Sequence, residues 1–282
     1  MISGAALRDP LSSVVLRCGP SLTEFISTVP LSDAAVDHLI RLPRLCTCHI
    51  EGPPPRYHPS GLPPFPPLTE LALGRGAGHG WLSLLNLSGA SSGVRESLKT
   101  LKFSSPTIDN SFASTIRIFR NLVDLDVVFF CDCGNGDNQC AFKLDNDNVT
   151  ELVVALPQLE FLLLGHPCSA NVCATTIACL LLISVHCIKL QVLVIHFNTT
   201  DIVDDLKNIS DNPRFQELRS RPRCILSHMD VHKTPLALDE PGFETVAKGM
   251  IDIFPSLQSC EGTVQNLDWG KVSEKITELR GV

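Results

Sequence analysis

The stretch NVTELVVALPQLEFLLLGH, residues 148–166, decides the fold of this chain. Its first half carries apolar residues three, four and seven positions after Val149, which is the spacing of one face of a helix. Pro157 disfavours helical backbone for the residue before it, so the helix is predicted to end there. A short apolar phrase follows, Leu159-x-x-Leu162-x-Leu164. The stretch therefore predicts one helix followed by one strand.

The same apolar phrase returns along the whole chain. The other complete copies are Leu45-Cys48-Ile50, Leu68-Leu71-Leu73, Leu98-Leu101-Phe103, Leu122-Leu125-Val127, Leu190-Leu193-Ile195 and Leu226-Met229-Val231. Fainter copies stand at Leu22-Phe25 and Leu257-Cys260. The copies begin at positions 22, 45, 68, 98, 122, 159, 190, 226 and 257. Proline stands two residues before the first leucine in several of the copies. At Pro43, Pro157 and Pro255 it follows a helical segment, so the same helix stop recurs in register.

A phrase of this kind, repeated with helical segments between its copies, is typical of a leucine-rich repeat. The predicted fold is α/β, a leucine-rich-repeat solenoid with a curved parallel sheet on its concave face and helices on its convex face. The repeats are degenerate, since the spacing of the later copies exceeds the roughly 20–29 residues of ordinary repeats. We expect residues 1–282 to form a single domain, with loops 51–67, 131–147 and 198–222 inserted between repeats. The last of these loops has room for a short helix that holds Asp204, Asp205 and Lys207.

Composition narrows the classes of function. Hydrophobic residues make up 44% of the 282 residues, which is enough to bury a long core. The net charge of −7 argues against a nucleic-acid partner, which calls for a basic surface. The 12 cysteines fall largely within repeats, where free thiols pack as small apolar groups, so we expect reduced thiols in an intracellular protein, cytoplasmic or nuclear. The longest apolar run in the least charged region, Ile177–Ile183, is too short for a membrane span.

Three segments resemble parts of the leucine-rich-repeat region of fungal F-box proteins, namely LDNDNVTELVVALPQLEFLLLGH (144–166), VHCIKLQVLVIHFNTTDI (185–202) and FETVAKGMIDIFPSLQS (243–259). The resemblance implies a ubiquitin-ligase substrate receptor, in which the repeats hold a substrate and the F-box binds a ligase adaptor. No F-box is visible, since the first 20 residues already have a repeat-like pattern, so an adaptor would require an F-box missing from this chain.

Three further motifs have structural explanations that we weigh against functional ones. Cys131, Cys133 and Cys140 could hold zinc together with His166, but the usual C-x2-C spacing is absent and free thiols are the preferred interpretation. The run Asp145–Asn148 is part of a calcium-loop pattern, yet it is better explained as a helix N-cap, with Asn148 as the cap and Glu151 hydrogen bonding back to it. The glycine-rich run 74–80 lacks the Lys-Ser/Thr of a phosphate-binding loop and is interpreted as a turn.

A partner is expected to bind the residues that lie between the apolar positions of each strand, because side chains alternate along a strand. These positions are acidic in the middle of the chain and apolar on the two following strands. The predicted partner-binding residues are Asp124, Asp126, Phe161, Leu163, Val192 and Val194. Two interpretations of the apolar four stay open: a protein partner covers them, or the C-terminal segment or an inserted loop of the chain does.

The sequence therefore predicts a protein–protein recognition module without a cofactor or a metal ion. No nucleophile elbow or papain-like context is present, so we expect no enzyme activity. The alternatives are an extracellular or membrane-linked leucine-rich-repeat recognition domain and, with less support, an enzyme with an unrecognised site.

Overall fold

The computed structural model describes residues 4–52, 66–74, 92–105, 110–129, 144–165, 174–231, 234, 236–262 and 267–281. The chain divides into two compact units, each described by itself. The first unit is Met1–Pro106 with Ile118–Val127, and the second is Thr107–Arg117 with Val128–Val282. The prediction of a single domain, residues 1–282, stays a prediction.

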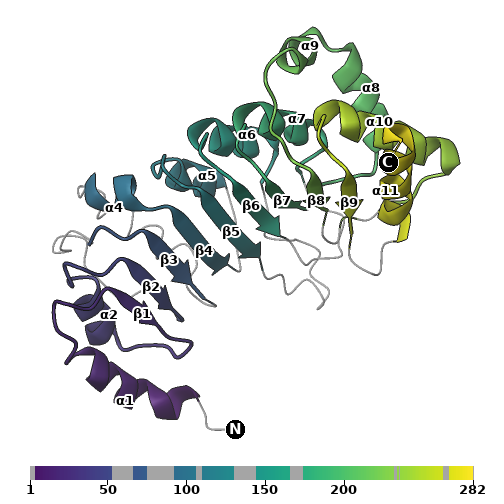
Figure 1. The fold of residues 1–282 in the computed structure, drawn as a ribbon. Helices are drawn as coiled ribbons and strands as arrows, with labels where there is room; N and C mark the ends of the chain where they lie inside the picture. Colours follow the sequence, from purple (N-terminus) through teal and green to yellow (C-terminus); the bar gives the residue numbers. More distant parts are fainter. Residues whose placement is uncertain are drawn as a thin grey trace. The chain divides into compact units, whose positions relative to one another are not determined.

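The first unit is a run of parallel strands with short helices between them (Figure 1). Its strands are β1 (Glu24–Ile26), β2 (Thr47–Ile50), β3 (Glu70–Leu73), β4 (Thr100–Ser105) and most of β5 (Asp124–Phe129). Its helices are α1 (Gly4–Val15), α2 (Asp33–Leu39) and α4 (Ser92–Ser97). The second residue of each repeat phrase pairs with its counterpart on the next strand, in the series Phe25, Cys48, Leu71 and Leu101.

The second unit follows the same plan with longer helices. Its strands are β6 (Phe161–Gly165), β7 (Val192–Ile195), β8 (His228–Asp230) and β9 (Ser259–Glu261). Its helices are α5 (Asn110–Ile116), α6 (Asn146–Ala155), α7 (Ala178–His186), α8 (Ile202–Asp211), α9 (Pro213–Arg219), α10 (Glu240–Ile253) and α11 (Leu267–Arg280). The ladder again joins equivalent phrase positions, in the series Leu162, Leu193, Met229 and Cys260.

All of these strand pairs are parallel, and the nine strands follow one another in the sheet in chain order. Each of the nine copies of the phrase gives one strand, the two faint copies included. The leucines of the phrase are buried, with Leu125 and Leu162 both 0% exposed. The predicted α/β leucine-rich-repeat architecture is therefore confirmed.

The sequence predicts segment 198–222 as a loop with room for a short helix around Asp204, Asp205 and Lys207, but the segment is mostly helical and forms α8 and α9. Ile202, Leu206 and Ile209 recur with helical spacing and are buried, while most of the other side chains of α8 are polar and gave the segment its loop-like composition. The Asn212 side chain accepts a hydrogen bond from the Arg214 backbone N–H and so caps the next helix, with Pro213 in its first turn.

The predicted loop 131–147 is wrong at its end, where α6 begins earlier than expected. Asp145 is the N-cap, and its side chain accepts from the Asn148 backbone N–H at 2.8 Å. The Asn148 side chain accepts from the Asp145 backbone N–H at 3.2 Å, which completes a capping box. Asn148 is therefore the third helical residue rather than the cap. Residues 131–143, and residues 53–65 of the predicted loop 51–67, lie outside the described residues.

The last helix, α11, lies beside β9 and α10 (Figure 1). Its Trp269 is 0% exposed, and the Trp269 indole N–H donates to the Thr234 carbonyl oxygen at 2.9 Å. The Trp269 ring meets the Phe197 ring edge to face, with ring centroids 6.0 Å apart. This apolar packing holds α11 against the terminal strand of the sheet.

Candidate partner-binding face

The four apolar residues predicted to bind a partner lie together on β6 and β7 of the second unit. Phe161 pairs with Val192 and Leu163 pairs with Val194 in the parallel ladder. We call these four residues the apolar block. Adjacent strands lie about 4.8 Å apart, so the four side chains form one contiguous surface.

The apolar block is on the accessible face of the sheet. Val192 is 42% exposed and the other three residues are half-buried, whereas Leu162, Leu164, Leu193 and Ile195 between and beside them are at most 2% exposed. The helices of this unit pack over the opposite face, which holds those buried leucines and isoleucine (Figure 1). The strand phase inferred from the repeat is thus the observed one, while the role of the block in binding stays a prediction.

The paired residues of the apolar block form two rows across the strands, one through Phe161 and Val192 and one through Leu163 and Val194. Both rows continue onto β8 and β9, where their residues are polar. Val192 pairs with His228, which pairs with Ser259. Val194 pairs with Asp230, which pairs with Glu261. His228 Nδ1 and Ser259 Oγ are 2.7 Å apart, a hydrogen bond within the first row. Because side chains alternate along a strand, His228 and Asp230 of β8 lie on the same face as the apolar block. Neither is among the predicted binding residues.

Asp124 and Asp126, the other two predicted residues, lie on β5 in the first unit. Lys102 Nζ is 3.5 Å from Asp124 Oδ2. Burial raises the pKa of the Asp126 carboxyl above its ordinary value; the positive charge of Lys102 opposes this rise and the negative charge of Asp124 adds to it. Among the described residues, Oδ1 of each aspartate is buried without a hydrogen-bond partner. The same face of this unit also holds a hydrogen bond between β2 and β3, which joins His49 Nε2 and Glu70 Oε1 at 2.8 Å.

The six predicted residues therefore belong to two surfaces, an acidic one in the first unit and an apolar one in the second. Each surface is contiguous within its own unit.

A cavity of about 760 Å³ lies on the helical side of the second unit, among α8, α10 and α11. The sequence did not predict this cavity, because most of the segment that forms α8 and α9 was interpreted as a loop. Gly249 on α10 lets Leu206 of α8 come close, since a Cβ at Gly249 would stand 2.5 Å from Leu206 Cδ2. Ion pairs engage some of the charges at the cavity, namely Lys207–Asp204 at 3.2 Å, Lys248–Glu244 at 2.5 Å and Arg219–Asp252 at 2.5 Å. Arg223 also lines the cavity, and its Nη1 is buried without a hydrogen-bond partner among the described residues.

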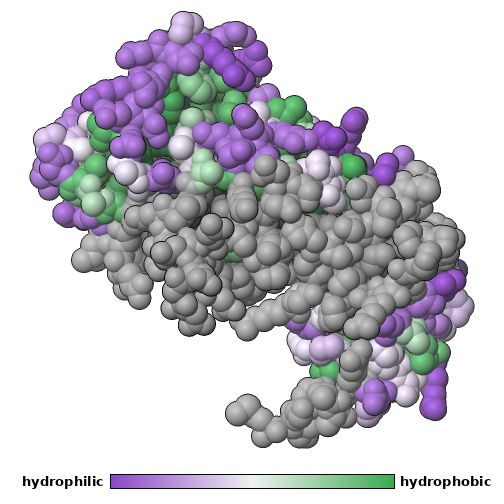
Figure 2. Space-filling view, turned by 180° about the vertical axis from the view of Figure 1, so that it is seen from behind, coloured by the Kyte–Doolittle hydropathy of each residue, from purple (hydrophilic) through white to green (hydrophobic). Residues whose placement is uncertain are grey.

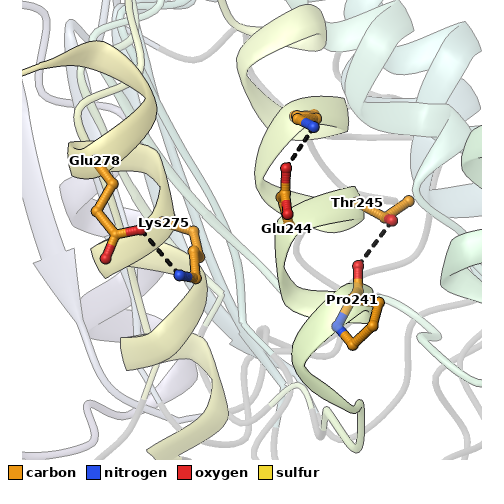
Figure 3. A network of polar contacts seen from close by, with 6 residues as sticks. Pro241, Glu244, Thr245, Lys275 and Glu278 are labelled. Carbon is orange, nitrogen blue, oxygen red and sulfur yellow. Dashed lines mark hydrogen bonds and ion pairs between the residues drawn. The ribbon is translucent and has the colours of Figure 1, made fainter.

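Apart from Arg219–Asp252, which joins α9 to α10, the ion pairs of α10 and α11 are formed within each helix. Figure 3 shows Lys275 donating to Glu278 at 2.9 Å on α11, and the Thr245 hydroxyl donating to the Pro241 carbonyl oxygen at 2.9 Å on α10. The hydrogen bond from Lys248 lowers the pKa of Glu244, and the one to Glu278 raises the pKa of Lys275. Figure 2 shows hydrophilic residues dominating the surface of α8 and α9. This side of the unit has the charge pattern of a solvated helical surface.

The remaining sequence motifs yield no ligand site in the described part of the chain. No group of three or more metal-ligating side chains is found there. Cys131, Cys133, Cys140 and His166 lie outside the described residues, as do residues 75–80 of the glycine-rich run. None of the described helices is both long and apolar enough to cross a bilayer.

Comparisons with known proteins add little. No family model matches the chain, and no curated protein matches it in sequence. Among solved structures, the yeast Rad7 and Elc1 complex is similar at 13% sequence identity, over 96% of this chain and 74% of that chain, with a TM-score of 0.25. At that TM-score the similarity assigns neither fold nor function.

Proposed function

We propose that this chain is a protein-recognition module that holds a protein partner on the strand face of its repeats. The specific role that its sequence resembles is that of the substrate-binding region in an F-box ubiquitin-ligase receptor. In that role a ligase adaptor would bind through an F-box outside these residues, and the protein would work inside the cell, in the cytoplasm or nucleus. Recognition requires no catalytic residue, cofactor or metal ion.

The observation that supports the proposal is the accessible apolar block. Phe161, Leu163, Val192 and Val194 form a contiguous patch where a strand exposed to water normally carries polar side chains. Large apolar patches on monomeric proteins usually mark interaction sites, because leaving them in water costs free energy that a partner recovers.

The competing explanations are that the chain covers the block with its own C-terminal segment or with an inserted loop. The substantial contacts of α11 within the described part of the chain are with α10 and β9 rather than with β6 or β7. This placement argues against α11 as the cover, and an aspartate substitution in the block distinguishes an inserted loop from a partner.

The test is an aspartate substitution in the apolar block, with a matched control. Val192→Asp puts a carboxylate into the block, and Val154→Asp makes the same change on α6, where Val154 is 53% exposed. Quantitative affinity purification with mass spectrometry should show partners of the parent chain that Val192→Asp loses and Val154→Asp keeps, while both variants melt like the parent. Ligase adaptor or substrate proteins among those partners would support the receptor role.

Two results would count against the proposal. A clearly lower melting temperature for Val192→Asp alone would mean that the chain itself covers the block, because burying an unpaired carboxylate is costly. Equal retention of every partner by both variants would mean that the block does not bind proteins.

Whether the cysteines are free or joined in disulfides distinguishes the intracellular receptor role from the extracellular alternative. Among the described cysteines, Cys18 and Cys46 are free and half-buried, and Cys48, Cys187, Cys224 and Cys260 are free and buried. An extracellular repeat domain would be expected to hold disulfides, so labelling of unfolded, unreduced protein distinguishes the two classes.

A further inference from the structure

We propose that the cavity among α8, α10 and α11 is a second binding site, which holds a small amphipathic molecule with an apolar body and an oxyanion head, a carboxylate or a phosphate. The head accepts a hydrogen bond from the Arg223 guanidinium, and the body packs against the apolar side chains of the cavity. This site lies on the helical side of the second unit, so it goes beyond the proposed function and does not depend on it.

The cavity has the size and the lining of a small-molecule site. Its volume of about 760 Å³ falls within the roughly 300–1,000 Å³ of typical ligand pockets. Helix α10 contacts both α8 and α11 (Figure 1), and these three helices carry most of the lining. Leu279 of α11 is 44% exposed, so an apolar body in the cavity would remove it from water. The apolar residues of the lining are Leu206, Ile251, Pro255 and Leu279.

Arg223 is held at the cavity with part of its guanidinium unpaired. Its Nη2 donates to the Arg219 carbonyl oxygen at 2.6 Å, at the C-terminal end of α9. Its Nη1 is buried and has no hydrogen-bond partner among the described residues. A buried donor without an acceptor is costly and rare in folded proteins. Because Arg223 lines the cavity, an oxyanion there supplies the missing acceptor once the guanidinium turns slightly about its bond from Nη2.

Two neighbouring arginines show the same deficit. Arg219 Nη2 donates to Ser210 Oγ at 3.2 Å, and Arg280 Nη2 donates to the Pro255 carbonyl oxygen, so each arginine contacts a residue of the lining. The Nε of each is buried without a partner in the described part of the chain. The other buried guanidinium nitrogen of this kind in that part belongs to Arg95 in the first unit. Unsatisfied guanidinium donors are therefore concentrated around this cavity.

Most of the other charged groups of the lining are engaged. Lys207 and Lys248 each pair with an acidic residue of their own helix, and Asp252 pairs with an arginine of α9. The remaining acidic residue of the lining, Asp211, is exposed. We therefore expect the oxyanion head beside Arg223, and a cationic ligand near Asp211 is the alternative that the test must separate.

The test titrates straight-chain probes into the intact chain and follows its methyl groups by NMR. The anionic probes are octanoate and octyl phosphate; 1-octanol and octylamine are the matched neutral and cationic probes, and inorganic phosphate is the head alone. The anionic probes should shift the methyl signals of Leu206, Ile251 and Leu279, with dissociation constants below about 1 mM. The signals of Val154, which is 53% exposed on α6, should stay unchanged. The more tightly bound of the two anionic probes identifies the head as carboxylate or phosphate.

Two comparisons measure the head and the body separately. Arg223→Gln should weaken octanoate binding about tenfold or more, since it removes a hydrogen bond to a charged group. The matched control Arg221→Gln changes an exposed arginine outside the lining and should bind like the parent. Shortening octanoate to hexanoate should weaken binding up to about fifteenfold, because each buried methylene contributes up to about fourfold.

Leu279→Ser tests the same cavity without changing Arg223, which also contacts α9 and so affects its packing. Because Leu279 is partly exposed, this variant should melt like the parent and bind octanoate several-fold more weakly. If Arg223→Gln fails to fold, this variant and the comparison of octanoate with 1-octanol still decide the outcome.

Four results would overturn the inference. The first is that neither anionic probe shifts the cavity methyl signals at millimolar concentration. The second is that 1-octanol or octylamine binds as tightly as octanoate, which would exclude an oxyanion head. The third is that inorganic phosphate binds as tightly as octyl phosphate, which would exclude an apolar body. The fourth is that a folded Arg223→Gln binds octanoate like the parent. Each leaves the proposed function standing, because the apolar block lies on the strand face.

Discussion

Replacing Leu162 by alanine probes the register of the repeat most directly. Leu162 is the middle residue of its phrase, is 0% exposed, and pairs in the ladder with Leu193, which is also 0% exposed. The substitution removes three buried carbons, worth about 2.4 kcal/mol at roughly 0.8 kcal/mol each. A cavity that the sheet cannot close adds to this, so we expect the free energy of unfolding to fall by about 2–5 kcal/mol.

The assay is urea denaturation followed by circular dichroism, with thermal melting in parallel. A small domain is stable by only about 5–15 kcal/mol, so a loss of this size is a clear shift of the midpoint. Val154→Ala on α6 is the matched control, since Val154 is 53% exposed and its truncation should change stability by less than about 0.5 kcal/mol. A Leu162→Ala variant that unfolds with the parent would refute the assignment of inward and outward positions on every strand.

Three further results are expected. Thiol labelling of the unfolded, unreduced chain should find most of the 12 cysteines free, and finding most of the 12 blocked would contradict the intracellular assignment. In the folded protein Cys48 and Cys187 should react slowly, because burial raises the pKa of each thiol to about 12. Asp145→Ala should destabilise α6 by about 1 kcal/mol in urea denaturation, because it removes the capping box, whereas an unchanged midpoint would refute that role. Asp126→Asn should raise stability at pH 7, since the raised pKa of Asp126 means that the folded state disfavours its charged form. The gain should shrink as the pH falls through the raised pKa of the folded state and should vanish below the ordinary pKa of aspartate, and a gain independent of pH would refute this explanation.

The sequence predicts the strands of this protein well because the repeat phrase reports burial directly. The repeat phrase is Leu-x-x-Leu-x-apolar. Its apolar side chains can all be buried only if they point from the strand toward the helices. Even the faint copies at Phe25 and Cys260 lie in strands that pair at the expected position. The same logic placed the apolar block on the accessible face, which the burial of its neighbours bears out.

The failures have physical causes of two kinds. The extent of α8 was underestimated because only Ile202, Leu206 and Ile209 are buried, so a few apolar residues had to be recognised among mostly polar ones. The N-cap of α6 was misplaced because Asp145 and Asn148 are both good capping residues, and only the backbone geometry shows which of them stands outside the helix. The cavity among α8, α10 and α11 could not be foreseen because the packing of α8 against α10 was not recognised.

The position of α11 has a consequence for how such a chain changes in evolution. Because the helix lies beside β9 and is held by Trp269, it occupies the end of the sheet where another repeat would have to stack. Duplication or loss of a repeat is therefore tolerated before β9, where each new strand finds a neighbour on both sides, but not directly after it. Changes in the number of repeats among descendants of this gene should accordingly leave β9 and α11 together as an inherited pair.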